Sequence, residues 1–263
     1  MSDALIGYTG FVGSTLLKQH TFEWQFRSVN INEIDGHHFD VVFCAAAPAQ
    51  KWIANLEPDA DRQKIEGLIA HLKTIQCKNF VLISTVDVFK SPVGVNEDTP
   101  VDEIGLHPYG LHRRLLEKFV EGNFANHLIV RLPGLVGPGL RKNVIYDFLN
   151  NNNLHAIESR GVFQFYPMVN LWSDIQSALQ AELKLIHLTA EPVSVAELSE
   201  NGFGKTFDQI LAGVPATYDF QSKYADVLGG HGVYQYSRRE TIQAIRAYAQ
   251  SEPRSIKIES GRV

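Results

Sequence analysis

Residues 4–17 read ALIGYTGFVGSTLL, and this stretch decides the fold. A short apolar run precedes glycines at 7, 10 and 13, and an amphipathic segment follows, which is the order of a strand, a tight turn and a helix. Glycine suits this turn because the backbone must bend sharply, approach a phosphate closely and let the helix pack on the strand. The helix N-terminus then offers free N–H groups to an anion. Since the turn follows the first strand, we expect a dinucleotide site.

The composition is that of a globular protein with a full-sized core. The 263 residues are 44% hydrophobic and 20% charged. A net charge of −5 argues against nucleic acid as the main partner, because phosphate binding needs a basic surface. No apolar stretch approaches the ~20 residues that span a bilayer, and no basic leader precedes the first strand. We therefore expect a cytoplasmic protein without a membrane partner, in which Cys44 and Cys77 are buried thiols.

Strands and helices alternate along the first half of the chain. Apolar runs predict strands at 24–29, 40–45, 79–84 and 127–132. Apolar stripes at helical spacing predict helices at 59–75 and 109–120. The segment 30–38 is too short for a full crossover helix. This alternation predicts an α/β, Rossmann-type, doubly wound parallel sheet.

The pattern loosens after Pro133. Here we expect helices at 144–149, 171–183, 195–200 and 239–250 and a strand at 185–188. The expected organisation is a dinucleotide-binding core over 1–140, followed by a mixed region, 141–263. This region completes the core and forms a small C-terminal substrate lobe, because ligands lie at the carboxyl ends of the strands.

Three stretches fall where carboxyl ends of strands converge. The first holds Ala45, Ala46 and Ala47, whose small side chains either let an adenine or ribose lie on the backbone or pack a strand end tightly. The second, 82–89 (LISTVDVF), carries hydroxyls that either meet a carbonyl substrate or satisfy local backbone groups. In the third, Tyr109 and Arg113 are one helical turn apart. The cation can lower the pKa of the phenol and make it an acid/base, although such a pair is also a common surface contact.

Taken in order, these motifs resemble the extended short-chain dehydrogenase/reductase family over residues 3–140. The order is Gly-x-x-Gly-x-x-Gly, Ser-Thr-x-x-Val-Phe, Tyr-x-x-x-basic and then RLPGLVGPG at 131–139. Two later pieces are similar, with less specific motifs, to the segments on the family's substrate side: Tyr166-Pro167 with Asp174, and residues 187–198. The resemblance implies that Thr85 polarises the substrate oxygen and that Tyr109 is the acid/base.

The resemblance also implies sets of binding residues. Arg113 stands where the family usually has a Lys that holds the nicotinamide ribose and lowers the pKa of the tyrosine. The implied cofactor-binding set, with Gly134 beside the nicotinamide, is Gly7, Thr9, Gly10, Phe11, Val12, Gly13, Arg27, Ser28, Ala45, Ala46, Ala47, Tyr109, Arg113, Pro133 and Gly134. The implied substrate-binding set is Thr85, Asp87 and Asn143.

Two departures from the family pattern bear on the reaction. Arg113 supplies charge, but its planar fork is not equivalent to an ammonium, so activity is altered or lost. The family's 4,6-dehydratases follow the Thr with an acid pair, and Val86 in the first of those places argues against dehydration. The Ser-Thr-x-x-Val-Phe segment is most similar to the 4-keto-sugar reductases, while the overall pattern is equally that of the epimerases.

The end of the second strand bears on the cofactor. NAD binding usually uses an acid there, but this chain has Arg27 and Ser28, which favour the extra phosphate of NADP. NAD remains possible, because Glu33 lies about 20 residues beyond Gly13, the usual distance for the acid. No metal site is predicted, since the histidines at 37, 38 and 107 lack ligand spacing.

The resulting prediction is an NAD(P)-dependent oxidoreductase or epimerase that acts on a nucleotide-linked sugar or a similar carbonyl or alcohol. By analogy with the family, the helices at 65–75 and 111–120 are expected to pack a homodimer. The competing hypothesis is a dinucleotide-binding sensor or regulatory protein that kept the fold and lost the chemistry.

Overall fold

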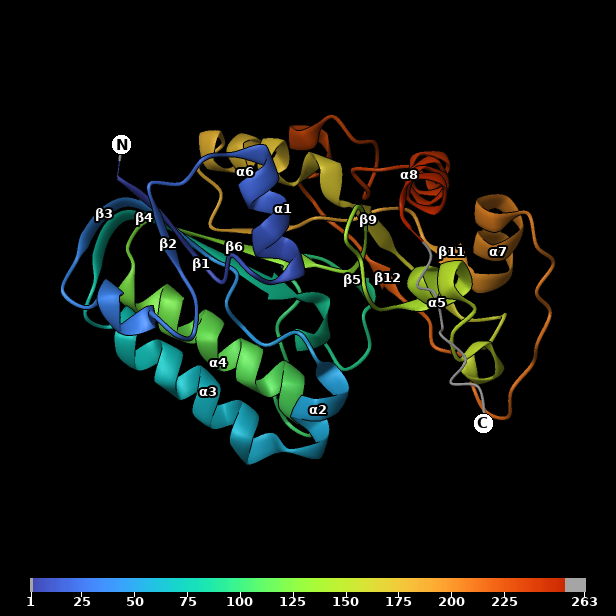
Figure 1. The fold of residues 1–263 in the computed structure, drawn as a ribbon, viewed down its shortest axis with the longest axis horizontal. Helices are drawn as coiled ribbons and strands as arrows, with labels where there is room; N and C mark the ends of the chain where they lie inside the picture. The colour runs from blue at the N-terminus through green and yellow to red at the C-terminus, as the bar shows by residue number, and fades with distance from the viewer. Residues whose placement is uncertain (1, 254–263) are drawn as a thin grey trace, which may run out of the picture.

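The computed structural model describes residues 2–253 and has a six-stranded parallel sheet at its centre (Figure 1). The spatial order is β2-β1-β3-β4-β6-β10. The strands are β1 (Asp3–Ile6), β2 (Trp24–Phe26), β3 (His38–Cys44), β4 (Gln76–Thr85), β6 (His127–Leu132) and β10 (Leu185–His187). Every neighbouring pair in this sheet is parallel. The predicted α/β class and Rossmann-type parallel sheet are confirmed.

Helices cover both faces of the sheet, as Figure 1 shows. One face carries α1 (Phe11–Gln19) and α6 (Leu171–Gln180), and the other carries α2 (Lys51–Leu56), α3 (Pro58–Leu72) and α4 (Pro108–Asn123). Successive strand residues point to opposite faces. In β4, Phe80 and Leu82 therefore join the core beneath α3 and α4, whereas Val81 and Ile83 join the core beneath α1 and α6. The sheet is buried on both sides, which explains its continuous apolar runs.

The strand order reverses beside β1. The segment between β2 and β3 contains only a 3₁₀ turn, η1 (Ile31–Ile34), in agreement with the prediction that it is too short for a full helix. As a result β2 pairs with one edge of β1 and β3 pairs with the other. In open α/β sheets, ligands bind at such a reversal, outside the carboxyl ends of the strands.

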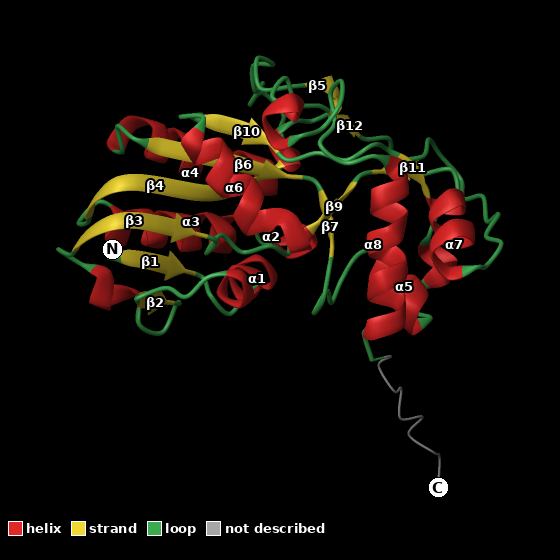
Figure 2. Ribbon diagram, turned by 90° about the horizontal axis from the view of Figure 1, so that it is seen from above, coloured by secondary structure: helices red, strands yellow, loops and turns green. Residues whose placement is uncertain are grey.

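The chain leaves the sheet after β6 and builds a lobe. Three helices form its core: α5 (Val144–Asn150), α7 (Val195–Phe203) and α8 (Arg238–Ser251). Figure 2 shows them beyond the carboxyl ends of the sheet strands. The chain crosses back in between to supply α6 and β10, which complete the sheet. The boundary at residue 140 stays a prediction, and residues 254–263 of the expected lobe lie outside the described part.

Short strand pairs and 3₁₀ turns connect the two parts. The paired strands are β7 (Gly134–Val136) with β9 (Phe165–Pro167), β8 (Val162–Phe163) with β11 (Val193–Ser194), and β5 (Val93–Val95) with β12 (Asp219–Phe220). The remaining 3₁₀ turns are η2 (Val86–Val88), η3 (Leu154–Ala156), η4 (Met168–Asn170) and η5 (Ala225–Leu228). None of these elements was predicted, because two to four residues are too few to show a periodicity.

Several predicted boundaries are wrong, and two of them have local reasons. β2 ends at Phe26 instead of 29, because the side-chain oxygen of Asn30 accepts the Arg27 N–H at 2.8 Å and turns the chain. The predicted helix at 171–183 ends at Gln180, and the residue Glu182 follows it with a φ of 53°.

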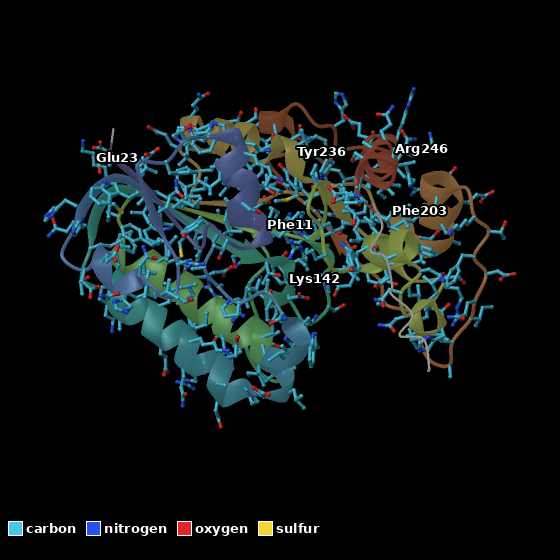
Figure 3. All side chains as sticks on the ribbon, in the orientation of Figure 1. Phe11, Glu23, Lys142, Phe203, Tyr236 and Arg246 are labelled. Atoms are coloured by element: carbon cyan, nitrogen blue, oxygen red, sulfur yellow. The ribbon has the colours of Figure 1, made fainter. Side chains whose placement is uncertain are left out.

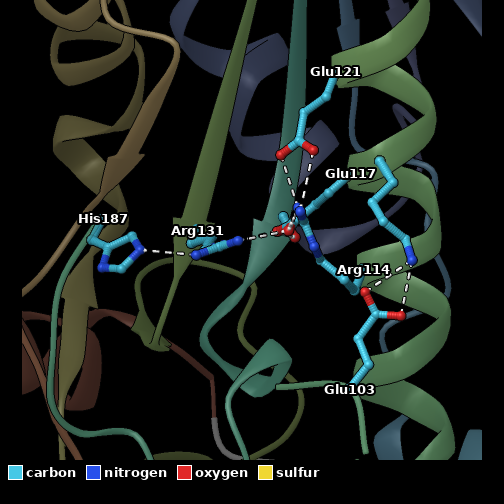
Figure 4. A network of polar contacts seen from close by, with 8 residues as sticks. Glu103, Arg114, Glu117, Glu121, Arg131 and His187 are labelled. Carbon is cyan, nitrogen blue, oxygen red and sulfur yellow. Dashed lines mark hydrogen bonds and ion pairs between the residues drawn. The ribbon is translucent and has the colours of Figure 1, made fainter. Parts of the chain in front are cut away.

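A buried ionic network joins α4 to β6 and β10 (Figure 4). Arg131 Nε and Nη2 donate to the two carboxylate oxygens of Glu117 at 2.9 and 2.7 Å, and Arg131 Nη1 lies 3.3 Å from His187 Nε2. Glu117, Arg131 and His187 are all buried. Burial, reinforced by the charge of Arg131, holds the pKa of His187 well below its usual value, so its imidazole is a neutral acceptor.

Candidate active site

The glycine turn lies at the carboxyl end of β1, and its three glycines differ in what surrounds them. Gly7 has a φ of +89°, and a Cβ there would lie 2.5 Å from Ala45 O. A Cβ on Gly13 would lie 2.2 Å from Gly7 O. These two glycines are therefore required by the packing of helix on strand. A Cβ on Gly10 would meet only Gly7 O, at 3.5 Å, so the packing itself would accept a side chain there.

The space at Gly10 fits an approaching phosphate. Gly10 is the N-cap of α1, no described side chain caps this helix, and its first turn carries no acidic residue. Thr9 and Gly10 are exposed, whereas Phe11 and Val12 are half-buried. Phe11 packs against both the sheet core and the lobe core, and Figure 3 shows it at the junction of the two. The turn therefore presents open backbone N–H groups at the junction.

The residues after β2 leave the nucleotide preference open. Arg27 and Ser28 are exposed directly after the strand. Glu33 lies in η1, where its carboxylate accepts a hydrogen bond from Asn30 Nδ2 at 3.3 Å. Glu23, the acid before β2, lies far from Phe11 in Figure 3, at the opposite end of the strand. Arg27 and Glu33 are thus both placed near the end at which a ribose would lie.

The loop after β3 links several parts of the site. Ala45, Ala46 and Ala47 are half-buried, and the backbone of Ala45 packs against Gly7. Further along, the carbonyl of Pro48 accepts a hydrogen bond from Arg113, and the carbonyl of Ala49 accepts one from Lys142. Lys142 comes from the loop before α5, so this contact joins the lobe to the edge of the sheet (Figure 3).

Tyr109 and Thr85 are brought together by the start of α4. Thr85 is the last residue of β4, and its Oγ1 accepts the N–H of Asp87 at 3.1 Å. A Cβ on Gly110 would lie 2.1 Å from the Asp87 carbonyl oxygen, so only glycine lets α4 approach η2 this closely. The N–H of Tyr109 donates to Asn55 Oδ1 at 3.0 Å, which fixes the helix start against α2. Tyr109 is buried, and the Thr85 hydroxyl lies close enough to its phenol to favour the ionised form.

Arg113 lies one turn after Tyr109 along α4 and contacts both the Tyr109 ring and Asp61. Its guanidinium carbon is 4.3 Å from the centre of the Tyr109 ring. Its Nη1 and Nη2 donate to the two carboxylate oxygens of Asp61, at 2.9 and 3.0 Å. His112 Nδ1 also donates to Asp61, at 2.8 Å. Arg113 Nε is buried and has no hydrogen-bond partner among the described residues.

Arg113 lowers the pKa of Tyr109, as expected, but it does not bring that pKa below its ordinary value. Burial raises the pKa of Tyr109 above its ordinary value, and the opposing effects of Arg113 and Thr85 are smaller. Asp87 adds to the rise. The pKa of Asp61, by contrast, is lowered: burial disfavours its charge, but the bonds from Arg113 and His112 outweigh burial.

A second ion pair lies near enough to affect the phenol electrostatically. Lys51, from the start of α2, donates to Asp87 Oδ1 at 2.7 Å, and Tyr218 OH lies 3.5 Å from the same oxygen. Burial would lower the pKa of Lys51, but Asp87 and the nearby phenols of Tyr109 and Tyr218 raise it overall. The arrangement thus offers two hydroxyls, from Thr85 and Tyr109, beside a closed ion pair.

The remaining predicted residues make contacts within the protein. Pro133 and Gly134 follow β6, and a Cβ on Gly134 would lie 2.6 Å from Gln164 O, so this glycine lets β7 pack on β9. Asn143 caps α5: its Oδ1 accepts the Ile145 N–H at 2.9 Å, and its Nδ2 donates to Leu135 O at 2.9 Å.

Sequence reasoning did not find several residues of the site. These are Asp61, Gly110, His112, Lys142 and Tyr218. One signal was present, because Asp61 stands four residues before Ile65 and so continues the buried stripe of α3. A carboxylate in an apolar stripe indicates a buried partner.

Comparison with known proteins identifies the fold. No family model and no curated protein matches the chain. Among solved structures, a dTDP-4-dehydrorhamnose reductase from Bacillus anthracis in complex with NADP is 15% identical, with a TM-score of 0.71 over 95% of this chain and 99% of that chain. A UDP-N-acetylglucosamine 4-epimerase from Methanobrevibacter ruminantium in complex with UDP-N-acetylmuramic acid is 13% identical, with a TM-score of 0.72 over 95% and 97%.

The enzyme WbmG from Bordetella bronchiseptica, in complex with NAD, is 16% identical, with a TM-score of 0.72 over 94% of this chain and 93% of that chain. The described residues include no helix that is both long and apolar enough to traverse a bilayer. The parallel sheet, the glycine turn and the match over nearly the whole length of these structures lead to one conclusion. The chain has the fold of the extended short-chain dehydrogenases/reductases.

Proposed function

We propose that the protein is an NAD(P)-dependent reductase or epimerase that acts on a nucleotide-linked sugar or a similar carbonyl or alcohol. The observation that carries this proposal is the meeting of the Thr85 and Tyr109 side chains at the carboxyl edge of the sheet, where the glycine turn also lies. The solved structures of the same fold support it, because those compared above are a sugar-nucleotide reductase with NADP, an epimerase with a UDP-sugar, and an enzyme with NAD.

The two hydroxyls would serve one substrate oxygen. When bound, the nicotinamide exchanges a hydride with the substrate carbon. Thr85 donates a hydrogen bond to the oxygen on that carbon and polarises it. Tyr109 transfers the proton to or from the same oxygen as general acid or base. Burial of Tyr109 keeps water from this proton and strengthens the hydrogen bonds.

The dinucleotide would bind along the crevice between β1 and β3. The open backbone at Gly10 and the uncapped start of α1 would hold the diphosphate. The buried, unpartnered Nε of Arg113 supplies a donor for a ribose hydroxyl. We favour NADP, because Arg27 and Ser28 offer a cation and a hydroxyl to the extra phosphate. NAD would instead place its ribose against Glu33.

A dinucleotide-binding sensor is the second candidate. The observation in its favour is that Arg113 forms a bidentate pair with Asp61, which the family's usual Lys would not form. In this case the cofactor binds, but no turnover follows.

A fluorescence titration with NADPH and NADH in parallel comes first. Tight NADPH binding with weak NADH binding supports the role of Arg27 and Ser28, and the reverse preference makes Glu33 the ribose ligand. Binding of neither refutes the proposal, because the glycine turn would then be structural only.

Turnover with a panel of nucleotide-linked keto sugars separates enzyme from sensor. Tyr109→Phe is expected to bind the cofactor normally and to lose about 10²- to 10⁴-fold in turnover. The matched control is Tyr248→Phe, which also removes a buried hydroxyl, one that donates to Leu140 O in the lobe. Equal turnover in Tyr109→Phe and wild type would exclude the acid/base role.

Two further expectations belong with this proposal. We propose a homodimer packed through the outer faces of α3 and α4, which sedimentation equilibrium tests directly. We also propose a cytoplasmic location, which fractionation of cells that express the tagged chain tests.

A further inference from the structure

The pair formed by Arg113 and Asp61 changes what the arginine can do for Tyr109. Both groups are buried, with exposed fractions of 3% and 5%. Each terminal nitrogen of the guanidinium faces one carboxylate oxygen, so the positive and negative charges are held within hydrogen-bond distance of each other. The Tyr109 ring stacks on this guanidinium. The phenol therefore lies beside a paired guanidinium, and the lowering effect of Arg113 on the pKa of Tyr109 is smaller than the effect of burial.

Other titratable groups near Tyr109 come from η2, α2, the start of α4 and the lobe, and the charge of Asp87 raises the pKa of the phenol. Asp87, from η2, is bound to Lys51 of α2. The ring of His107 is 6.3 Å from that of Tyr109, and burial lowers the pKa of this histidine, so it is uncharged near neutral pH. Lys142, from the lobe, donates to the Ala49 carbonyl, and burial lowers its pKa as well. Thr85 and Tyr218 add only hydroxyl groups.

We infer that Asp61 is a positioning residue that neutralises Arg113 and thereby keeps Tyr109 a phenol, so that the resting site is built to donate a proton to a substrate carbonyl. This inference rests on the proposed function and narrows it to the direction of reduction. His112 contributes by holding Asp61 from the side that Arg113 leaves open.

The step balances as a carbonyl reduction. A reduced nicotinamide, when bound, supplies the hydride that forms the new bond at the carbonyl carbon and is itself oxidised. The proton of Tyr109 passes to the carbonyl oxygen, and the C=O double bond becomes a C–OH single bond. The phenolate that remains regains a proton from solvent once the product has left the site.

Tyrosine ionisation tests this without cofactor or substrate. The chain is labelled with ¹³C-tyrosine, and the Tyr109 signal is identified by its loss in Tyr109→Phe. In the wild type, Tyr109 is expected to remain protonated beyond the ordinary tyrosine pKa of ~10. In Asp61→Asn, which keeps the shape and removes the charge, Tyr109 is expected to ionise at a pH lower by about one unit or more, because Arg113 is then a free cation.

Glu117→Gln is the matched control. Glu117 is another buried carboxylate that accepts two hydrogen bonds from an arginine, Arg131 (Figure 4). It lies about two helical turns after Tyr109 along α4. This variant is expected to lose stability without moving the Tyr109 titration. An unchanged titration in Asp61→Asn, or an equal shift in Glu117→Gln, overturns the inference. If Asp61→Asn does not fold, the wild type decides, because ionisation of Tyr109 below the ordinary tyrosine range contradicts it.

The titration and the activity assays can fail separately. Failure of cofactor binding or turnover removes the proposed function and leaves the titration intact. If the Tyr109 titration is unchanged in Asp61→Asn while Tyr109→Phe loses turnover, only the role of Asp61 is removed.

Discussion

Replacing Arg113 by Lys restores the residue type usual in the family, and the structure predicts that this replacement damages the protein. A lysine ammonium can retain the charge but not the two parallel bonds to Asp61, and it also gives up the bond to the Pro48 carbonyl. A hydrogen bond to a charged group contributes about 1.5–3 kcal/mol. Losing one of the two bonds to a carboxylate that is 5% exposed therefore costs about 2 kcal/mol.

The cost is measurable as a shift in Tm. For a chain of this size, 1 kcal/mol corresponds to about 2–4 °C, so Arg113→Lys is expected to lower the Tm by about 4–8 °C. Circular dichroism during thermal unfolding measures it. The control is Arg62→Lys on α3, where the arginine pairs with Glu66 in solvent and the Tm is expected to stay unchanged.

Two results would refute the reasoning. One is an Arg113→Lys variant as stable as the wild type, which would mean that the bidentate geometry contributes nothing. The other is a large gain in turnover, which would identify the natural protein as a degenerate binder that the arginine had inactivated.

Three further perturbations follow from particular contacts. Gly110→Ala would put a Cβ 2.1 Å from the Asp87 carbonyl oxygen, so it is expected to cost about 1–3 kcal/mol of stability and most of the turnover. Gly122→Ala on the same helix would meet no atom within 4 Å and is expected to preserve stability and turnover. Denaturation and activity assays measure the two effects. Burial raises the pKa of Asp174, so the folded state binds its proton more tightly than the unfolded state and loses stability as pH rises through the acid range. The free energy of unfolding of Asp174→Asn, measured with urea, should therefore increase relative to that of the wild type as pH rises. A difference that stays constant with pH would contradict this. Arg27→Ala is expected to weaken NADPH binding at least about tenfold and leave NADH binding unchanged in the fluorescence titration; equal weakening of both would exclude a phosphate contact.

The elements that could be predicted are those whose signal is local. The glycine turn and the long buried strands are specified by neighbouring residues, and both were found. The starts of α7 and α8 were also readable, because Ser194 with Glu197 and Ser237 with Glu240 form capping boxes. β5 and β12 could not be found, since they are two or three residues long and pair across more than 120 positions.

Sequence reasoning named some members of the candidate site and missed its electrostatics. Tyr109 and Arg113 were named from their helical spacing, and Thr85 from the motif order that resembles the family. The sign of the pKa shift of Tyr109 was missed, because it depends on the burial of the phenol and on Asp87, neither of which the spacing of Tyr109 and Arg113 shows. A sequence pattern shows which charges a helix carries, but not which of them a neighbouring helix has already neutralised.

The return of the chain from the lobe to the sheet has a consequence for protein synthesis. α6 covers one face of the sheet together with α1, and β10 closes its edge, yet both are made after residue 170. As the chain emerges from the ribosome, the first five sheet strands are complete while Val81, Leu128 and Val130 still lack their cover. This apolar surface stays open to chaperones or to aggregation until α6 is out. Truncation before α6 would make that transient exposure permanent.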